Sequence, residues 1–373
     1  MAEKWILSLR EILNNIFELI YWLGVIDLFH IFDKINNGGI YVIAEMSANH
    51  GGSLDTALQI VREAAKAGAD CVKIQTYTAD SITIDCDNEY FKIKGGLWDG
   101  YKLHDLYKEA GTPYEWHKAI KDECEKCGVD FLSTPFDPDA VDFLEDLGVE
   151  AYKIASFELN DVPLIEYAAS KGKPMIMSCG MASPEDIQDA VDACRRAGND
   201  KIVLLKCCSE YPANWEDMHL GNIPDMKKRF GVPVGLSDHS FGSIGAVVAV
   251  SLGARVIEKH VKIDGVESAD SAFSMTMDEF ANMVQDANNA LAIAKGPDYS
   301  LSKKEQESTV FRRSLFAVKD INPGDEITAE NVRSIRPGNG IRPKYLKQMI
   351  GKKAKSALKF GQPVTQEFLD ELE

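Results

Sequence analysis

The chain has 373 residues, of which 45% are apolar and 27% are charged. This length suits one large domain plus a smaller one, and the composition excludes a disordered or fibrous protein. Its 58 acidic and 41 basic residues give a formal net charge of −17, which argues against binding to nucleic acid or anionic lipid. An anionic substrate would therefore need a local cluster of basic side chains.

The eight cysteines are too sparse for a disulfide scaffold, and several lie inside apolar runs. They predict reduced, buried thiols in a cytoplasmic protein. Cys124 and Cys127 have the spacing of a redox or half-zinc motif, but the chain contains no second pair with this spacing. We therefore interpret that pair as a coincidence within a helical segment.

Residues 5–32 form an apolar stretch that charged residues interrupt. Its apolar positions recur at helical spacing, at Ile6, Leu9, Leu13, Ile16, Ile20 and Leu23. No uncharged run there reaches the roughly 18 residues that a membrane span needs, and the segment lacks the order of a signal peptide. We expect an atypical N-terminal extension, residues 1–39, with an amphipathic helix that could lie on a membrane interface, cover a partner or reflect a misassigned start.

Eight short apolar runs, each followed by a helical segment, occupy the next part of the chain. They are residues 41–46, 71–76, 130–135, 151–156, 174–178, 202–207, 233–239 and 255–261. Most starts are 21 to 31 residues apart, which fits one strand and one crossover helix per unit. Residues 40–296 are therefore predicted to form a (β/α)8 TIM barrel. The exceptional interval of 59 residues predicts a long loop, residues 77–116, that shapes a substrate pocket.

The repeat stops near residue 297, and the composition changes. Residues 297–312 are predicted to be a linker, and residues 313–373 contain short β segments with Pro-Gly turns. A mixed-β domain of about sixty residues is only marginally stable alone, so we expect it to pack on a barrel, its own or a neighbour's.

Polar side chains follow the predicted strands at the barrel end where such enzymes carry their chemistry. They are Glu45, Lys73, Gln75, Ser133, Thr134, Lys153, Ser156, Ser178, Ser237, His239 and His260. Structural ion pairs of the lysines with Glu45 or Glu158 are one interpretation. Two lysines among hydroxyls at one barrel end favour a phosphate or carboxylate site instead.

His239 and His260 end the seventh and eighth strands, which are neighbours in a barrel. Both imidazoles could reach one divalent ion, with oxygens, including that of Glu45, in the remaining positions. Such an open site suits a Lewis acid that polarises a carbonyl group. His50 could touch substrate or cap its loop. No dinucleotide fingerprint or phosphate loop is present, so neither NAD nor ATP is indicated.

Motifs along the chain resemble those of the sialic acid synthases. They are Ala44-Glu-Met-Ser-Ala-Asn-His50, Val72-Lys-Ile-Gln-Thr76, Tyr152-Lys-Ile-Ala-Ser-Phe-Glu158, Gly235-Leu-Ser-Asp-His239, Ile257-Glu-Lys-His260 and Arg336-Pro-Gly-Asn-Gly340. The resemblance covers about residues 40–373 and implies a synthase barrel followed by an antifreeze-like (SAF, β-clip) domain. It does not extend to residues 1–39.

The resemblance implies a metal-dependent condensation of phosphoenolpyruvate with an open-chain N-acetylated amino sugar, with release of phosphate. Phosphoenolpyruvate would contact Lys73, Gln75, Thr134, Lys153, Ser156, Ser178 and Ser237, and the sugar would contact Tyr211, Asp270 and Arg336. His239 and His260 would bind the divalent ion, with Mn²⁺ expected and Mg²⁺ or Co²⁺ as alternatives. A carboxylate, Glu45 or Glu158, would assist the addition of water. A homodimer is implied, with the SAF domain of one subunit reaching the partner barrel.

Some positions depart from the pattern of the sialic acid synthases. Ser209 stands where they have Asn, and Glu267-Ser-Ala-Asp270 replaces their Gly-Pro-Asp. Gly95-Gly-Leu-Trp-Asp99, Thr112-Pro-Tyr-Glu-Trp-His117 and Glu267-Ser-Ala-Asp-Ser-Ala-Phe-Ser274 resemble the family members that make pseudaminic acid. This resemblance implies a 2,4-diacetamido-2,4,6-trideoxy hexose as acceptor. Sialic or legionaminic acid as product, another phosphoenolpyruvate condensation, and a non-catalytic carbohydrate-binding protein are the alternatives.

Overall fold

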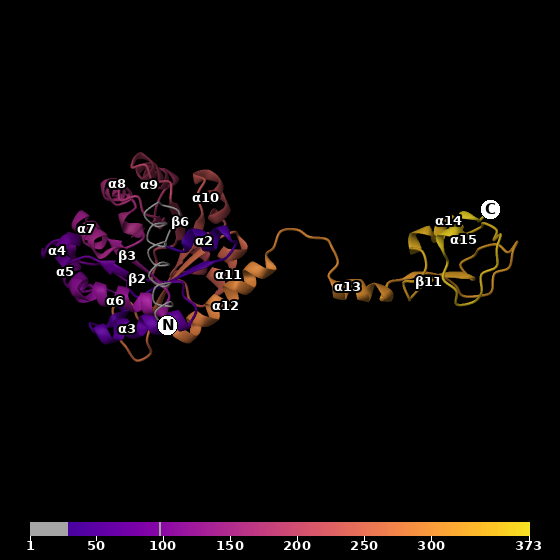
Figure 1. Cartoon of the computed structure of the whole chain (residues 1–373), viewed down its shortest axis with the longest axis horizontal. Coiled ribbons are helices and arrows are strands. Elements are labelled where there is room, and N and C mark those ends of the chain that lie inside the picture. The colour runs from indigo at the N-terminus through magenta and orange to yellow at the C-terminus, as the bar shows by residue number, and fades with distance from the viewer. Residues whose placement is uncertain (1–28, 97) are drawn as a thin grey trace, which may run out of the picture. The chain divides into compact units, whose positions relative to one another are not determined.

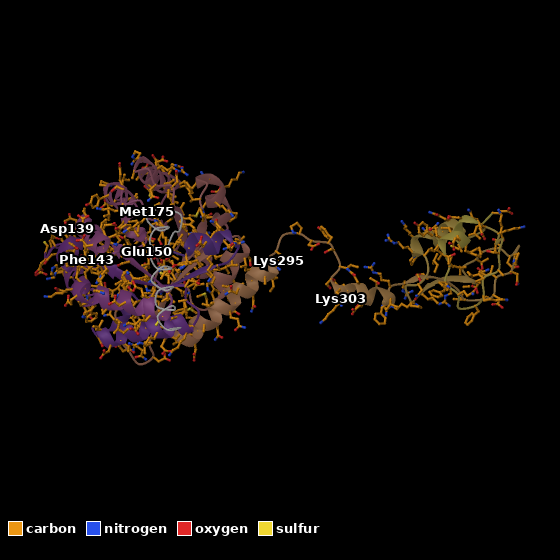
Figure 2. The ribbon with its side chains drawn as sticks, in the orientation of Figure 1. Asp139, Phe143, Glu150, Met175, Lys295 and Lys303 are labelled. Atoms are coloured by element: carbon orange, nitrogen blue, oxygen red, sulfur yellow. The ribbon has the colours of Figure 1, made fainter. Side chains whose placement is uncertain are left out.

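The computed structural model describes residues 29–96 and 98–373. The amphipathic helix expected in residues 5–32 lies almost entirely outside the described residues. The chain divides into two compact units, one that ends at Lys295 and one that spans Gly296–Glu373. Figure 2 labels Lys295, the last residue of the first unit, and Lys303, which belongs to the second unit.

Eight parallel strands form the first unit's sheet, and β1 pairs with β8 as well as with β2, which closes the barrel. The strands are β1 (Tyr41–Glu45), β2 (Cys71–Thr76), β3 (Asp130–Pro135), β4 (Tyr152–Ile154), β5 (Met175–Ser178), β6 (Ile202–Cys207), β7 (Val234–Asp238) and β8 (Val256–Lys262). The predicted (β/α)8 barrel is confirmed. A short strand that the sequence did not indicate, β9 (Met275–Thr276), pairs with the end of β8.

Helices surround the barrel in Figure 1. They are α3 (Leu54–Lys66), α6 (Tyr114–Cys127), α7 (Pro138–Leu147), α8 (Val162–Ala169), α9 (Pro184–Arg196), α10 (Asn222–Phe230), α11 (Ile244–Ser251) and α12 (Met277–Ile293). In α3, Ser53 caps the first turn, and Ile60 and Ala64 repeat at helical spacing on the buried face. None of the helices in residues 29–96 and 98–373 is long and apolar enough to span a membrane.

The barrel interior is apolar at the amino ends of the strands and polar at their carboxyl ends. Its apolar layer contains Tyr41, Ile43, Cys71, Leu132, Ala151, Ile176, Val203, Leu205 and Val256. Because side chains alternate along a strand, Lys73 points inward like Cys71, and Lys153 points inward like Ala151. The inward-facing positions of a strand therefore begin in the packed apolar layer and end at the charged mouth of the barrel.

Helix α2 (Ile31–Asn36) belongs to the segment that the motifs do not cover. Its Ile31 and the preceding Phe29 are fully buried against the apolar interior layer, and the Phe29 and Tyr41 rings lie 5.6 Å apart between centroids. Residues 29–36 thus close the barrel at the amino ends of the strands.

The long loop between β2 and α6 contains α4 (Ala79–Ile82), the 3-10 helix η2 (Glu89–Phe91) and α5 (Leu103–Ala110). The Tyr77 ring packs edge-on against Phe136, with 5.1 Å between centroids, and anchors the start of the loop beside β3. The loop therefore stays over the carboxyl end of the barrel.

The second unit begins with α13 (Lys303–Ser308) and the 3-10 helix η5 (Thr309–Phe311), within the segment predicted as a linker. Strands β10 (Ser314–Ala317) and β11 (Val332–Ile335) then form a small antiparallel sheet. The 3-10 helix η6 (Pro343–Tyr345), α14 (Leu346–Met349) and α15 (Gln366–Asp370) complete this unit. Its separate core includes Leu315, Ile327, Met349, Val364 and Phe368.

Candidate active site

A cavity of about 780 Å³ opens at the carboxyl ends of the barrel strands. Most of the predicted site residues line it, namely Glu45, Lys73, Gln75, Lys153, Ser156, Glu158, Ser178, Tyr211, Ser237, His239, His260 and Asp270. The long loop after β2 contributes part of the wall, including Tyr77, Trp98 and Tyr107. Side chains from six of the strands and from the loops that follow several of them are thus brought to one place, although they are far apart in the sequence.

Some predicted residues lie elsewhere. Thr134 is buried below the cavity, with its Oγ1 3.5 Å from Nζ of Lys73. Ser133 points out of the barrel, where it bonds to Thr76 at 2.6 Å, and Thr76 in turn bonds to His117 at 2.8 Å. The alternation of side chains along β3 separates Ser133 from its neighbour, so Ser133 has a structural role.

Arg336 lies in the second unit, exposed on a turn between β11 and η6. The buried Ser314 holds this turn, because its hydroxyl accepts the N–H of Gly340 at 2.9 Å and donates to the Pro337 carbonyl at 2.6 Å. The backbone that carries the arginine is therefore fixed within its own unit.

Two lysines and two glutamates form a buried charge network on the cavity floor. Nζ of Lys73 lies 2.7 Å from Glu45 Oε2 and 3.5 Å from Glu258 Oε1. Nζ of Lys153 lies 3.6 Å from Glu258 Oε2 and donates to the Ser178 hydroxyl at 2.7 Å. The expected local basic cluster is therefore neutralised by two carboxylates, because buried charges require partners.

The pKa shifts within this network follow from burial and charge. Burial lowers the pKa of Lys73, but Glu258 and Glu45 outweigh it and raise the pKa above its ordinary value. At Lys153 burial prevails over Glu258, and the pKa is lowered. Burial raises the pKa of Glu45 despite Lys73, whereas the two lysines overcome burial and lower the pKa of Glu258. An anion bound beside Lys153 would favour its ammonium form.

Glu258 is the functional candidate that sequence reasoning missed. It lies between the two lysines, is 4% exposed, and accepts a hydrogen bond from the Ser237 hydroxyl at 3.3 Å. The available signal was its position two residues before His260 on β8, which places both side chains inside the barrel.

His239 and His260 lie side by side at the cavity, with ring centroids 5.3 Å apart. Nδ1 of His239 donates to the Cys208 carbonyl at 2.9 Å, which leaves Nε2 as the lone-pair nitrogen of the neutral ring. Nδ1 of His260 is buried and has no hydrogen-bond partner among the described residues. Burial lowers the pKa of His260 well below its ordinary value, which favours the neutral imidazole that binds metals.

The imidazoles of His239 and His260 fit a divalent ion as an incomplete set of protein ligands. In residues 29–96 and 98–373, no group of three or more His, Cys, Asp or Glu residues is placed to hold a metal. Glu45, the expected oxygen donor, is paired with Lys73 instead. The other ligands of an ion would therefore be oxygens of substrate or water.

Glu158 differs from Glu45 and Glu258 because it has no ion pair with either lysine. Its Oε2 is buried without a hydrogen-bond partner among the described residues. Burial raises the pKa of Glu158 to about 7, with Lys153 opposing. Such a group can exchange a proton near neutral pH.

Aromatic rings form one wall beside the histidines. The Tyr211 ring lies 4.3 Å from that of His239, 5.0 Å from Phe273 and 6.0 Å from Trp98, between centroids. Trp98 also donates from Nε1 to the Ala269 carbonyl at 3.2 Å. The cavity thus combines a charged floor with an apolar wall, which suits a ligand that has an anionic end and apolar substituents.

Gly180 permits a close approach beside the predicted phosphoenolpyruvate contacts. A Cβ at this position would lie 2.1 Å from Ser209 Oγ and 2.8 Å from Ser156 Oγ. Its N–H donates to Ser156 at 3.0 Å. Only glycine lets the backbone after β5 come this close to both hydroxyls.

His50 is buried and does not line the cavity. Its Nδ1 accepts the N–H of Gly52 at 3.1 Å, and its ring packs edge-on against Trp116, with 5.5 Å between centroids. Of the two roles considered for this histidine, the structure shows the loop cap.

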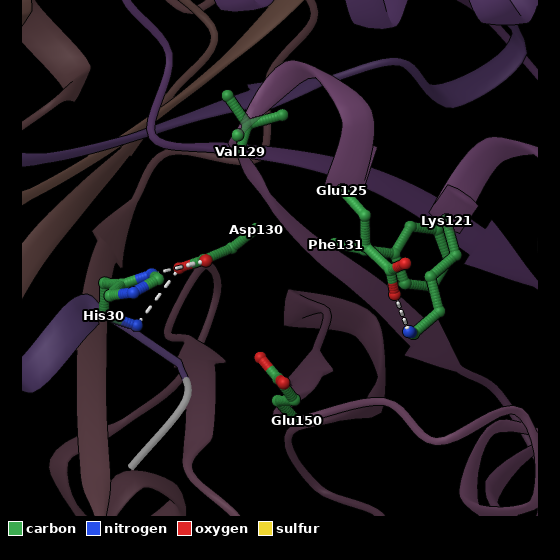
Figure 3. A pocket seen from close by; sticks show the side chains of 8 residues that line it. His30, Lys121, Glu125, Val129, Asp130, Phe131 and Glu150 are labelled. Carbon is green, nitrogen blue, oxygen red and sulfur yellow. Dashed lines mark hydrogen bonds and ion pairs between the residues drawn. The ribbon is translucent and has the colours of Figure 1, made fainter. Parts of the chain in front are cut away.

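A second, smaller cavity of about 250 Å³ lies at the opposite end of the barrel (Figure 3). His30 reaches Asp130 there through its backbone N at 3.1 Å and its Nδ1 at 2.8 Å, and Glu150 lies nearby. Barrel enzymes carry out their chemistry at the carboxyl ends of the strands, so we assign this end a structural role.

The chain is similar to known proteins over both units. The sequence profile of the NeuB family matches residues 60–298, and that of the SAF domain matches residues 312–370. Pseudaminic acid synthase of Campylobacter jejuni is 47% identical over 328 residues, which are 88% of this chain and 96% of the relative. Pseudaminic acid synthase of Helicobacter pylori is 40% identical over 87% of this chain and 96% of the relative.

A solved structure is similar in fold as well as in sequence. The N-acetylneuraminic acid (sialic acid) synthetase of Leptospira borgpetersenii is 32% identical, with a TM-score of 0.65. The similarity covers 72% of this chain and 90% of that one.

Proposed function

The chain belongs to the NeuB family and carries a C-terminal SAF domain, and from this membership we propose that it condenses phosphoenolpyruvate with an open-chain 2,4-diacetamido-2,4,6-trideoxy hexose to give pseudaminic acid. The observation that carries the proposal is the cavity itself, which places two lysines, several hydroxyls, two histidines and an aromatic wall around one space. The names of the two similar curated relatives support the choice of acceptor.

We assign the charged floor to phosphoenolpyruvate. Lys73 and Lys153, with Ser156, Ser178, Ser237 and Gln75, supply cationic and neutral donors for its phosphate and carboxylate oxygens, and Thr134 supports Lys73 from below the cavity. Because Glu45 and Glu258 already neutralise the lysines, an incoming anion competes with these carboxylates. Uptake of a proton by one of them would keep the buried charge balanced.

His239 and His260 would hold a divalent ion, which we propose to be Mn²⁺, with Mg²⁺ or Co²⁺ able to replace it. When bound, the ion would supply Lewis-acid polarisation of the aldehyde oxygen of the sugar. The rings of Tyr211 and Phe273 pack beside the two histidines. Tyr211 and Asp270 would contact the sugar.

The bond changes then follow from the positions of the substrates. The enol carbon of phosphoenolpyruvate attacks the aldehyde carbon, whose oxygen takes up a proton, and positive charge develops next to the bridging oxygen. Water adds at that carbon, and Glu158 accepts its proton; Glu45, held by Lys73, provides negative charge near the cationic centre. The hydroxyl proton of the adduct leaves with the phosphate as the C–O bond breaks, and a 2-keto acid remains. The proton that Glu158 takes from water balances the one gained by the aldehyde oxygen.

We further propose that the protein works in the cytoplasm as a homodimer in which Arg336 of one subunit reaches the sugar bound in the partner's barrel. The fixed turn that carries the arginine supports this assignment. A marginal domain of this size would gain stability from such a contact.

The experiment that tests the function measures phosphate release from phosphoenolpyruvate by the full-length protein. Each candidate sugar is added in turn, with EDTA alone and with EDTA followed by excess Mn²⁺. We expect release with the diacetamido-trideoxy hexose, loss with EDTA and recovery with the ion. Release only with N-acetylmannosamine would indicate sialic acid synthesis, and binding of sugar without any release would indicate a carbohydrate-binding protein.

A further inference from the structure

Ser47 has an unusual backbone conformation for its residue type. It follows β1 as the first residue of the 3-10 helix η1 (Ser47–His50) and has a φ of +46°. In the described part of the chain, the other non-glycine residues with positive φ are Met181 and His219. Glycine adopts this conformation without steric cost, so the backbone alone does not explain a serine here.

The hydroxyl of Ser47 connects two cavity residues. It donates to Oδ2 of Asp270 and accepts a hydrogen bond from Nε2 of Gln75 at 3.0 Å. The N–H of Ala48 also points at the same Asp270 oxygen, at the longer distance of 3.4 Å. Among the described residues, no hydrogen bond engages the other oxygen, Oδ1, of this cavity-lining carboxylate.

The two partners of Ser47 depend on it unequally. Gln75 has a second anchor, because its Nε2 donates to Glu45 Oε1 at 3.1 Å. The carboxylate of Asp270 has no other side-chain donor among the described residues. Loss of the Ser47 hydroxyl would therefore leave the Asp270 carboxylate with only the long hydrogen bond from the Ala48 N–H, while Gln75 stays held.

We propose that Ser47 is a positioning residue that directs the free oxygen of Asp270 towards the acceptor sugar. The inference rests on the proposed function for the identity of the acceptor. Strain at a functional site is tolerated when the strained residue supplies a needed contact, and here that contact is the hydroxyl. The Ser47 hydroxyl thus links the floor of the cavity to the loop after β8 that contacts the sugar.

The test compares S47G with H219G. Both variants replace a residue of positive φ by glycine, but His219 is exposed and does not line the cavity. Both should therefore keep or raise the thermal midpoint. S47G alone should raise KM for the acceptor by about tenfold or more, as expected for loss of a hydrogen bond to a charged group, and leave KM for phosphoenolpyruvate unchanged.

Hydrogen exchange of residues 267–274 separates this inference from the proposed function, because it needs no turnover. Faster exchange of that segment in S47G than in H219G would support the positioning role even if the wild type released no phosphate with the proposed acceptor. Unchanged exchange, or an unchanged KM for the acceptor of an active enzyme, would overturn it.

Discussion

Lys259 and Asp238 form an ion pair on the outer side of the barrel, with 2.8 Å between Nζ and Oδ2. They are register partners on β7 and β8, and each is 1% exposed. Asp238 also accepts the N–H of Ser240 at 2.9 Å. The pair therefore ties together the two strand ends that carry His239 and His260.

We predict that D238N destabilises the protein by about 3–5 kcal/mol, because it leaves the charge of Lys259 buried and uncompensated. Urea unfolding measures this change. D122N is the control, since the Lys118–Asp122 pair has the same 2.8 Å separation but is exposed, and its loss should leave the urea midpoint almost unchanged. Equal effects of the two variants would refute the structural role of the buried pair.

For Lys153 we predict that K153M raises KM for phosphoenolpyruvate about ten- to hundredfold, the loss expected for charge-assisted hydrogen bonds to an anion. KM for the sugar should change much less. Initial rates at varied concentrations of each substrate give both values. K126M, which alters a lysine that is 69% exposed on α6, serves as the control. Equal increases in both KM values for K153M would mean general damage instead.

The periodic features of the sequence were sufficient to predict the barrel and much of its mouth. Strand spacing predicted eight parallel strands, and the alternation along β2 placed Lys73 and Gln75 on the same inner face. The same rule would have separated Ser133 from Thr134 and would have identified Glu258. The pairing of the buried lysines with glutamates was harder to predict from the sequence, because Lys73 meets Glu258 only after the sheet closes.

Contacts that depend on loop conformation could not be predicted from local pattern. Trp98 approaches Tyr211 and the Ala269 carbonyl only because the long loop after β2 folds over the barrel mouth. The positive φ of Ser47 has no sequence signal either, since serine rarely adopts that conformation.

For Glu158 we predict a dependence on pH. With a pKa raised to about 7, it is increasingly protonated below that pH and cannot accept a proton, so the rate should fall as the pH decreases through 7. E158Q should lose both this acid limb and most of the activity. A pH–rate profile that keeps its acid limb in E158Q would assign the proton transfer to another group.

The raised pKa also predicts a stability effect with a definite sign. The folded protein favours protonated Glu158, so this group stabilises the fold fully below its ordinary pKa of 4.5. That stabilisation is lost as the pH rises towards 7. The unfolding free energy of the wild type, measured by urea titration relative to that of E158Q, should therefore fall as the pH rises over this range.

The proposed dimer predicts complementation between two inactive variants. H260A lacks a candidate metal ligand, and R336A lacks the arginine of the second unit. Mixed subunits should recover part of the activity, because some hybrid dimers contain one barrel with His260 served by an intact Arg336 of the partner subunit. Continued inactivity, in mixtures shown by mass spectrometry to have exchanged subunits, would assign the arginine to its own barrel or to neither.

The proposed condensation breaks the C–O bond of phosphoenolpyruvate. Its most direct test uses phosphoenolpyruvate labelled with oxygen-18 at the bridging position, together with the diacetamido-trideoxy hexose, and mass spectrometry of both products. The label should leave with the released phosphate, and the keto acid should carry none of it. Label retained in the keto acid would show cleavage of the P–O bond and would contradict the proposed mechanism.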